Sequence, residues 1–311
     1  MRAWRSHCYG GLAELRLEEA RVPPLCAPDH LLVRVHTSSI NPLDVAMVGG
    51  YGARALNALR ALRGADVEFP LVVGRDFCGE VVAAGAGSRL RAGRRVWGVV
   101  PPHWPGAHAD YLVVKDNWVT VGCAGEMRER ALALGAAEAL DRHAADYDRR
   151  LEELGPYDAI LDCAGLGGAE AGARAWRFAR YVTLSAPLLR ETDRRGLLAG
   201  TAAAALRLAA HSAAAARASP PAPAAPPALC PPHVRWAFFS PSAHDLQLLR
   251  RLADAGKFKV AVERVFPWWA GREAYERAAA GGARGKLLLH MAAPEPPAPP
   301  APTAPTAHTP S

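Results

Sequence analysis

A small set of residues places polar or aromatic groups where they could bind and orient a ligand. An amide and a carboxylate occur three residues apart in the segment SINPLD, an aromatic ring ends the segment VRWAFF, and a guanidinium follows two small residues in GARGK. Each group also has a structural interpretation, because Asn and Asp side chains often bond the local backbone in turns, an aromatic ring fills strand cores and glycine favours turns. The candidates are Asn41, Asp44, Ala237, Phe239, Gly282, Ala283 and Arg284.

Metal, nucleophile and nucleic-acid chemistry are not predicted by this sequence. The six cysteines are widely spaced without a Cys-x-x-Cys pair, so we expect free thiols and no zinc site. Ser185 and His211 have no motif-supported partner, whereas a nucleophilic hydrolase needs a base held beside its nucleophile. The formal charge of +7 comes mostly from scattered arginines without a basic block rich in aromatic residues, which disfavours nucleic-acid binding.

The first 118 residues of the chain have the pattern of a small β-barrel. Residues 12–17 and 31–36 alternate between apolar and polar side chains, and we expect these two strands to pair. Further short strands, separated by glycines, are predicted over residues 71–73, 78–83, 95–100 and 109–114. Short strands at this spacing are typical of a closed, mostly antiparallel sheet.

From residue 119 onward, strand patterns alternate with helix patterns, which predicts a parallel sheet with right-handed crossovers. The expected strands are 119–121, 138–140, 158–162, 181–185 and 234–239. The expected helices are 126–134, 147–154, 169–178 and 244–256. The segment GLGG after the strand 158–162 is interpreted first as a turn at the strand end, because a lone glycine cluster is weak support for a phosphate loop.

The C-terminal part of the chain contains one apolar helix and a biased tail. Residues 197–216 are rich in Ala but carry Arg207 and His211, so we expect an exposed or loosely packed helix and no membrane span. Strands are predicted over 259–266 and 285–291, with a helix over 271–280 between them. The tail 292–311 is rich in Pro, Ala and Thr, and we expect it to be disordered.

Collinear motifs now indicate a family. SINPLD, GRDFCGEVV, GRRVWGVVPP and GARGK resemble the quinone-oxidoreductase branch of the zinc-independent medium-chain dehydrogenase/reductase superfamily, and EFPLVVGRD, VRWAFF and LADAGK resemble its mitochondrial, reticulon-interacting members. Zinc-type members carry His-Glu where this chain has Arg75 and Asp76. The resemblance implies a GroES-like β-barrel domain over residues 1–118, completed by 258–291, and a Rossmann-like cofactor domain over 119–257.

The resemblance also implies that the Rossmann-type part is truncated. In the family, a strand, a GxxGxxG-type turn and a helix follow the last barrel strand, and the N-terminus of that helix binds the pyrophosphate of the cofactor. Here residues 115–118 lead directly into VTVGC, which resembles the family's second Rossmann strand. We therefore expect an incomplete parallel sheet with unpaired strand edges and weak or no NADPH binding.

The function implied by the resemblance is an NAD(P)H-dependent quinone oxidoreductase. Hydride transfer from nicotinamide to a quinone depends on positioning, so no catalytic triad is expected, and the candidate residues above would approach the cofactor or substrate. NADPH is the cofactor implied, although Ala124 cannot donate a hydrogen bond to a 2′-phosphate. The resemblance further implies a mitochondrial location, and the alternative function is a catalytically silent protein that binds a membrane protein such as a reticulon.

Overall fold

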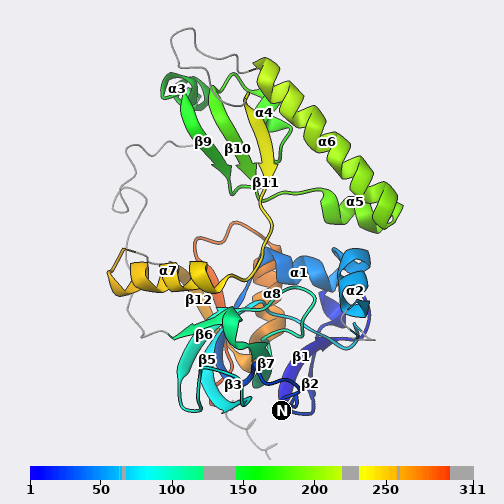
Figure 1. Ribbon diagram of the computed structural model, residues 1–311, viewed down its shortest axis with the longest axis vertical. Helices are drawn as coiled ribbons and strands as arrows, with labels where there is room; N and C mark the ends of the chain where they lie inside the picture. The colour runs from blue at the N-terminus through cyan, green and yellow to red at the C-terminus, as the bar shows by residue number, and fades with distance from the viewer. Residues whose placement is uncertain (63, 65–67, 122–144, 219–230, 258–259, 295–311) are drawn as a thin grey trace, which may run out of the picture.

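The computed structural model describes residues 1–62, 64, 68–121, 145–218, 231–257 and 260–294. These residues form a β-barrel body, drawn mainly in blue, cyan and orange, and a parallel-sheet body, drawn in green and yellow (Figure 1). Several expected features lie outside the described residues: the helix 126–134, the strand 138–140, Ala124, and the tail from residue 295 onward.

Strand β3 (His30–Ile40) is the central strand of the barrel. Along one edge it pairs antiparallel with β5 (Asp76–Ala84), and along the other with β7 (Tyr111–Lys115) and then β13 (Lys286–His290). Alternate side chains of β3, including Leu31 and Val33, are fully buried in the barrel core, as expected for a strand with one buried face. The seven-stranded sheet also contains β6 (Arg95–Val99), β8 (Val119–Val121) and β12 (Val262–Pro267).

The expected pairing of residues 12–17 with 31–36 is wrong. Residues Leu12–Glu14 form a 3₁₀ turn, and the strand that follows, β2 (Arg16–Glu19), pairs with β1 (Arg2–Ser6) in a three-stranded sheet with β4 (Leu71–Val72). The physical reason is that both edges of β3 are already occupied by β5, β7 and β13.

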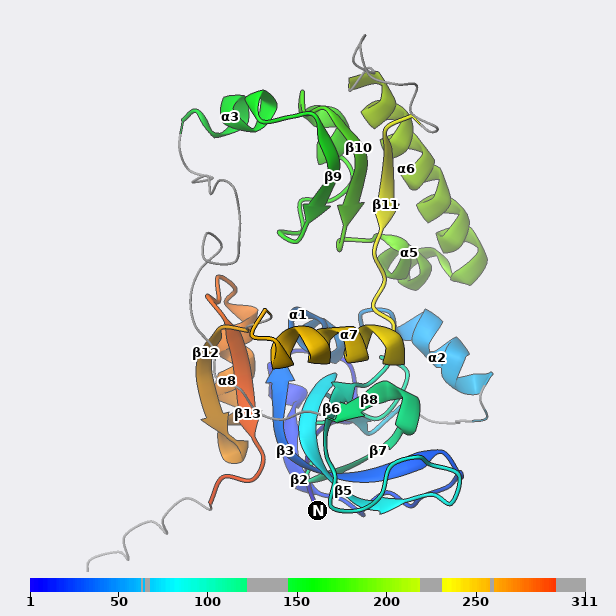
Figure 2. The ribbon, with the colours of Figure 1, turned by 60° about the vertical axis from the view of Figure 1, so that its left-hand side comes forward.

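Strand β8 is confirmed at residues 119–121, but it lies in a different sheet from the one expected. It pairs antiparallel with β6 of the barrel, so that Val96 is opposite Val121 and Gly98 is opposite Val119. Helix α7 (Ala243–Asp254) packs against β8, and Figure 2 shows it lying across the end of the barrel. The backbone groups of this strand are therefore satisfied by the barrel, not by the parallel sheet.

The second body is an incomplete Rossmann-type sheet. Strands β9 (Tyr157–Asp162), β10 (Phe178–Thr183) and β11 (His233–Trp236) are parallel in the order β11-β10-β9. Within the described residues β9 has only β10 as a neighbour. The helix expected over 169–178 is limited to α4 (Glu170–Ala173), because β10 already begins at residue 178.

Helices cover one side of this sheet. Helix α3 (Tyr147–Glu153) precedes β9, and α5 (Leu188–Arg195) and α6 (Leu197–Ala218) lie between β10 and β11. Helix α6 packs on α4, α5 and β11, yet Leu198 and Leu206 remain 90% and 73% exposed, which agrees with the expected exposed helix. Among the described helices, α6 is long and apolar enough to cross a membrane by length and composition, which is weak support for a span.

The two bodies meet between helices α2 (Ala53–Ala61) and α5. The carboxylate of Asp193 accepts hydrogen bonds from the backbone N–H groups of Gly52 at 2.7 Å and Arg54 at 3.1 Å. In both views the carboxyl ends of β9, β10 and β11 point toward the end of the barrel that carries α7 and α1 (Pro42–Val48) (Figures 1 and 2). Ligands of open parallel sheets bind at this edge.

Candidate functional site

Four polar side chains meet at the end of the barrel and form what we call the Lys286 cluster: Ser39, Asn41, Asp76 and Lys286. The Asp76 carboxylate oxygen Oδ2 accepts hydrogen bonds from Ser39 Oγ at 2.6 Å, Asn41 Nδ2 at 3.0 Å and Lys286 Nζ at 3.1 Å. Lys286 Nζ also donates to Asn41 Oδ1 at 2.5 Å. Strand register explains the cluster, because Ser39 of β3 lies opposite Asp76 of β5, and Lys286 opens the strand that pairs with the end of β3.

The Lys286 cluster holds a fixed and accessible positive charge. Burial raises the pKa of Asp76, but the Lys286 ammonium and the hydrogen bonds from Ser39 and Asn41 outweigh it, so the pKa lies below its ordinary value. Asp76 is therefore ionised at neutral pH and stabilises the ammonium. The Lys286 side chain is 39% exposed, and two of its three N–H donors are used by Asp76 and Asn41. The third is available to a ligand.

Asp44 lies beneath this cluster and does not reach a ligand. Its side chain is fully buried, and its carboxylate accepts hydrogen bonds from the backbone N–H groups of Asn41 at 2.8 Å and Gly74 at 3.2 Å. The Arg75 Nε atom lies 3.7 Å from Asp44 Oδ1. Of the two candidates in SINPLD, Asn41 thus joins the cluster, whereas the position of Asp44 favours the structural interpretation, a cap at the start of α1.

We expect the stability of the chain to depend on the ionisation of Asp44. Burial raises the pKa of Asp44 from 3.8 to about 6, despite the opposing effect of Arg75. A raised pKa in the folded state means that this contribution to stability is full below pH 3.8 and is lost as the pH rises through about 6. In urea unfolding across this window, the difference in free energy of unfolding between D44N and wild type should shift in favour of D44N as pH rises. A difference that is constant with pH would contradict the assignment.

The glycine-rich candidates form an exposed loop that leads into Lys286. Gly282, Ala283 and Arg284 are exposed, and Gly282 has a φ of +64° that favours glycine. The backbone N–H of Arg284 donates to Glu263 Oε2 at 2.5 Å. The structure gives these residues no hydrogen bond to the Lys286 cluster within the described parts of the chain; their observed contribution is to place Lys286 at the start of β13.

Ala237 and Phe239 lie in the segment that links the two bodies. The N–H of Ala237 donates to Thr183 O at 3.0 Å, which extends the β10–β11 pairing by one residue. Phe239 lies beyond β11 and is 45% exposed, so it does not fill a strand core. Its ring remains a candidate for contact with a ligand between the bodies.

Sequence reasoning missed three members of the cluster, namely Ser39, Asp76 and Lys286. All three stand in the matched motifs: Ser39 in SINPLD, Asp76 in GRDFCGEVV and Lys286 in GARGK. The usable signal was charge complementarity: an Asp and a Lys in two strand-forming motifs can pair when their strands flank a third. That contact requires the register of β5, β3 and β13, which one sequence does not supply.

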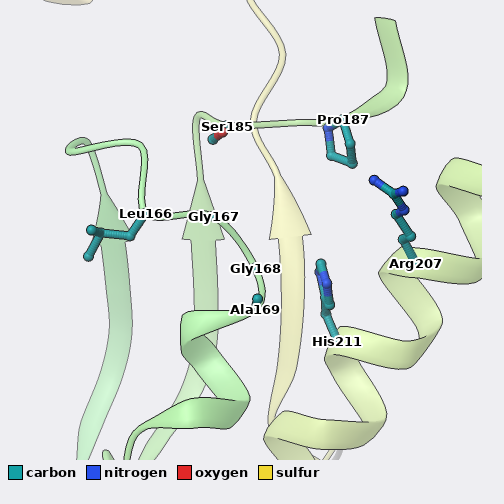
Figure 3. Close-up of a pocket in the computed structure, with 8 residues that line it drawn as sticks. All are labelled: Leu166, Gly167, Gly168, Ala169, Ser185, Pro187, Arg207 and His211. Carbon is teal, nitrogen blue, oxygen red and sulfur yellow. The ribbon is translucent and has the colours of Figure 1, made fainter. Parts of the chain in front are cut away.

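A second site lies at the carboxyl ends of the parallel strands (Figure 3). It is a pocket of about 270 Å³ lined by Leu166, Gly167, Gly168, Ala169, Ser185, Pro187, Arg207 and His211. The GLGG loop on one wall is a turn at the end of β9, as expected. Its backbone N–H groups, from Ala164 to Gly167, donate to the Asp162 carboxylate at 2.8 to 3.2 Å.

The described residues fit only part of a dinucleotide. Ligand pockets for drug-sized molecules have volumes of roughly 300–1,000 Å³, so a pocket of about 270 Å³ suits only one small group of a dinucleotide. Three of the four N–H groups of the GLGG loop, those of Gly165, Leu166 and Gly167, already bind Asp162 and so are not available to a phosphate. Within the described ranges, the chain thus offers room for one small group and no assigned place for the pyrophosphate.

Comparison with known proteins identifies the superfamily. A family model described as zinc-binding dehydrogenase matches residues 134–289, and one described as alcohol dehydrogenase GroES-like domain matches residues 27–125. The chain belongs to the medium-chain dehydrogenase/reductase superfamily. Its fold agrees, since a solved NAD-dependent alcohol dehydrogenase superimposes with a TM-score of 0.65 at 17% identity, covering 94% of this chain and 100% of that one. The quinone oxidoreductase from Coxiella burnetii gives a TM-score of 0.57 at 16% identity, covering 94% and 99%.

Curated relatives of this superfamily member are mitochondrial oxidoreductases by name. The chain is 29% identical to the mitochondrial NAD(P)H oxidoreductase RTN4IP1 of Drosophila melanogaster, covering 94% of this chain and 86% of the relative. It is 28% identical to the human protein of that name, covering 94% and 89%. The alignment with the Drosophila protein spans 367 residues, more than the 311 of this chain, so it must open gaps in this chain.

The zinc implied by the name of the matched family does not fit the residues at the barrel end. Arg75 stands where zinc-type members have a ligand, and its guanidinium donates to the carbonyls of Pro101 and Trp104 at 2.9 Å each and of Val72 at 3.1 Å. Neither a guanidinium nor an ammonium is a zinc ligand, and the neighbouring Asp76 carboxylate is already bound to Lys286. No step of the chemistry below involves zinc.

Proposed function

We propose that this chain is an NAD(P)H oxidoreductase-like protein that keeps the acceptor side of a quinone reductase and binds its nicotinamide cofactor, NADPH, weakly. The observation that carries the proposal is the Lys286 cluster, an ammonium anchored by Asp76 and Asn41 at the barrel end. The names of the relatives support oxidoreductase chemistry with NAD(P)H. The cofactor is weakly held because the sequence lacks the glycine-rich turn and helix that bind pyrophosphate in such folds.

The chemistry assigned to the cluster is stabilisation of negative charge. When bound, a nicotinamide supplies a hydride, which is two electrons and one proton. A quinone that accepts a hydride at one oxygen or ring carbon becomes a hydroquinone monoanion, and protonation from solvent completes the hydroquinone. Lys286 donates its remaining N–H to the acceptor oxygen as charge develops, and Asp76 holds the ammonium in place.

Replacing Lys286 by Met should lower quinone reduction by about 100-fold, the usual order for removing one such donor. The measurement is quinone-dependent oxidation of NADPH, followed at cofactor concentrations raised to the millimolar range because binding is weak. The expected loss is in kcat, since the hydrogen bond strengthens as charge develops. Lys115→Met is a matched control: that lysine pairs with Asp29 at 3.4 Å and is 37% exposed. Full activity in K286M would show that Lys286 has no part in the reaction.

The proposed location and partner of this chain rest on the names of its relatives alone. We propose a mitochondrial location because the relatives with high coverage are named mitochondrial. A Caenorhabditis elegans relative, 26% identical, is named Reticulon-4-interacting protein 1, and a reticulon-type membrane protein is therefore proposed as a partner. If the chain neither binds nor oxidises NADPH, this interaction becomes its main function, and co-precipitation with a reticulon is then the deciding assay.

A further inference from the structure

The pocket at the end of the parallel sheet has a wall supplied by α6. Arg207 and His211 are four residues apart on α6 and therefore share one face of the helix. Figure 3 shows both side chains directed toward the pocket, with the GLGG loop opposite His211 and Ser185 at the end of β10. The pocket thus brings together a guanidinium, an imidazole and a hydroxyl.

The charge at this wall is positive. Glu191 is 3% exposed, and its carboxylate is shared by Arg195 at 2.8 Å and Arg207 at 3.0 Å. Two guanidinium groups balanced by one carboxylate leave a net positive charge. Arg207 is half exposed and uses one terminal nitrogen for Glu191, so its other donors remain available. No carboxylate is among the residues that line the pocket.

The negative charge behind the GLGG loop belongs to a carboxylate whose oxygens already accept hydrogen bonds. The carboxylate of Asp162, which lies behind the GLGG loop, accepts the loop N–H groups and the Thr183 hydroxyl at 2.7 Å. Those hydrogen bonds offset its burial and lower the pKa of Asp162, so it is ionised, but its charge is directed into the loop. Arg207 is therefore the charged group that faces a ligand.

His211 is fitted closely to the loop. A Cβ atom on Gly168 would lie 2.6 Å from His211 Nδ1, so only glycine allows this approach. Nδ1 is buried without a hydrogen-bond partner among the described residues. Unpaired buried polar atoms are rare in native proteins. Burial and Arg207 lower the pKa of His211, so the ring is neutral and can serve as a hydrogen-bond donor or acceptor.

We propose that this pocket binds a small anionic group, a carboxylate or a phosphate, through Arg207, with His211 and Ser185 completing its hydrogen bonds. Guanidinium groups bind both anions through paired N–H donors. The anion is either a free metabolite or the phosphate of a larger molecule such as the cofactor, and the pocket volume of about 270 Å³ admits only one such group. The proposal does not depend on hydride transfer or on the Lys286 cluster.

Calorimetric titration of the full chain with inorganic phosphate and, separately, acetate tests the proposal. We expect saturable binding of at least one anion with a Kd of about 1 mM, weakened by added salt. Arg207→Gln should weaken binding by about tenfold or more. Arg217→Gln is the matched control, because Arg217 lies on the same helix and is absent from the pocket lining. His211→Phe, which keeps the ring size, should also weaken binding.

The outcomes separate this site from the proposed oxidoreductase function. Displacement of the bound anion by NADPH would show that the group belongs to the cofactor, and lack of displacement would show a separate ligand; either result keeps the anion site. Absence of saturable binding up to about 20 mM of both anions would overturn the proposal. Equal binding by R207Q and R217Q would overturn it as well, whatever the quinone assay shows.

Discussion

Replacing Arg75 by Met should destabilise the barrel by about 3–5 kcal/mol, the usual cost of breaking a buried ion pair from one side. Arg75 is 2% exposed, and its guanidinium donates to the backbone carbonyls of Pro101, Trp104 and Val72. Met removes every donor, so these acceptors lose their partners and Asp44 loses its nearest cation. Unsatisfied buried groups add to the cost. Urea unfolding followed by tryptophan fluorescence measures the change.

Arg34→Met is the matched control for this prediction. Arg34 lies on β3 of the same barrel, and its guanidinium is 3.4 Å from Glu80 with half of the side chain exposed. Exposed ion pairs of this kind contribute about 0–1 kcal/mol. A decrease in the free energy of unfolding below about 1 kcal/mol in R75M, or an equal decrease in both variants, would show that the contacts of Arg75 do not stabilise the barrel.

Arg75 also illustrates what the sequence alone could predict. Its place in GRDFCGEVV indicated the family and disfavoured zinc, and the alternation along residues 31–36 predicted a strand with one buried face, as β3 has. These inferences succeed because they depend on local residue patterns. The three backbone carbonyls that bind Arg75 come from residues 72, 101 and 104, and no local pattern reveals such a contact.

The predictions that were wrong or incomplete also concern contacts between segments far apart in the sequence. Residues 119–121 were correctly predicted as a strand, but their partner is β6 of the barrel, because pairing depends on which edges are free in the folded chain. Residues 12–17 were predicted to pair with residues 31–36 of β3, whose edges are occupied by other strands. Lys286 was overlooked as a site residue for a related reason, since it meets Asp76 only through the register of strands far apart in sequence.

Cofactor affinity is the second property for which we expect a large effect. In a complete fold of this type, the helix after the glycine-rich turn provides several N–H donors and a positive helix end to the pyrophosphate. Each hydrogen bond to a charged group contributes about 1.5–3 kcal/mol, so loss of two or more should weaken binding by over about 100-fold. The loop after β9 does not compensate, since its N–H groups bind Asp162.

The incomplete parallel sheet supports this expectation. The sheet has three strands in the described part of the chain, where β9 has only β10 as a neighbour. In Rossmann sheets the strand that precedes the phosphate-binding turn is central. Without it, we expect the barrel to fold and hold the Lys286 cluster and the site for the pyrophosphate to be lost.

Calorimetric titration of the full chain with NADPH, beside the human mitochondrial relative as a reference, measures the effect of the missing phosphate-binding unit on cofactor affinity. We expect the relative to bind with a Kd at least about 100-fold lower than this chain, and this chain to show no saturation at micromolar NADPH. A micromolar Kd for this chain, accompanied by quinone-dependent oxidation of NADPH, would contradict the claim that its phosphate-binding unit is missing.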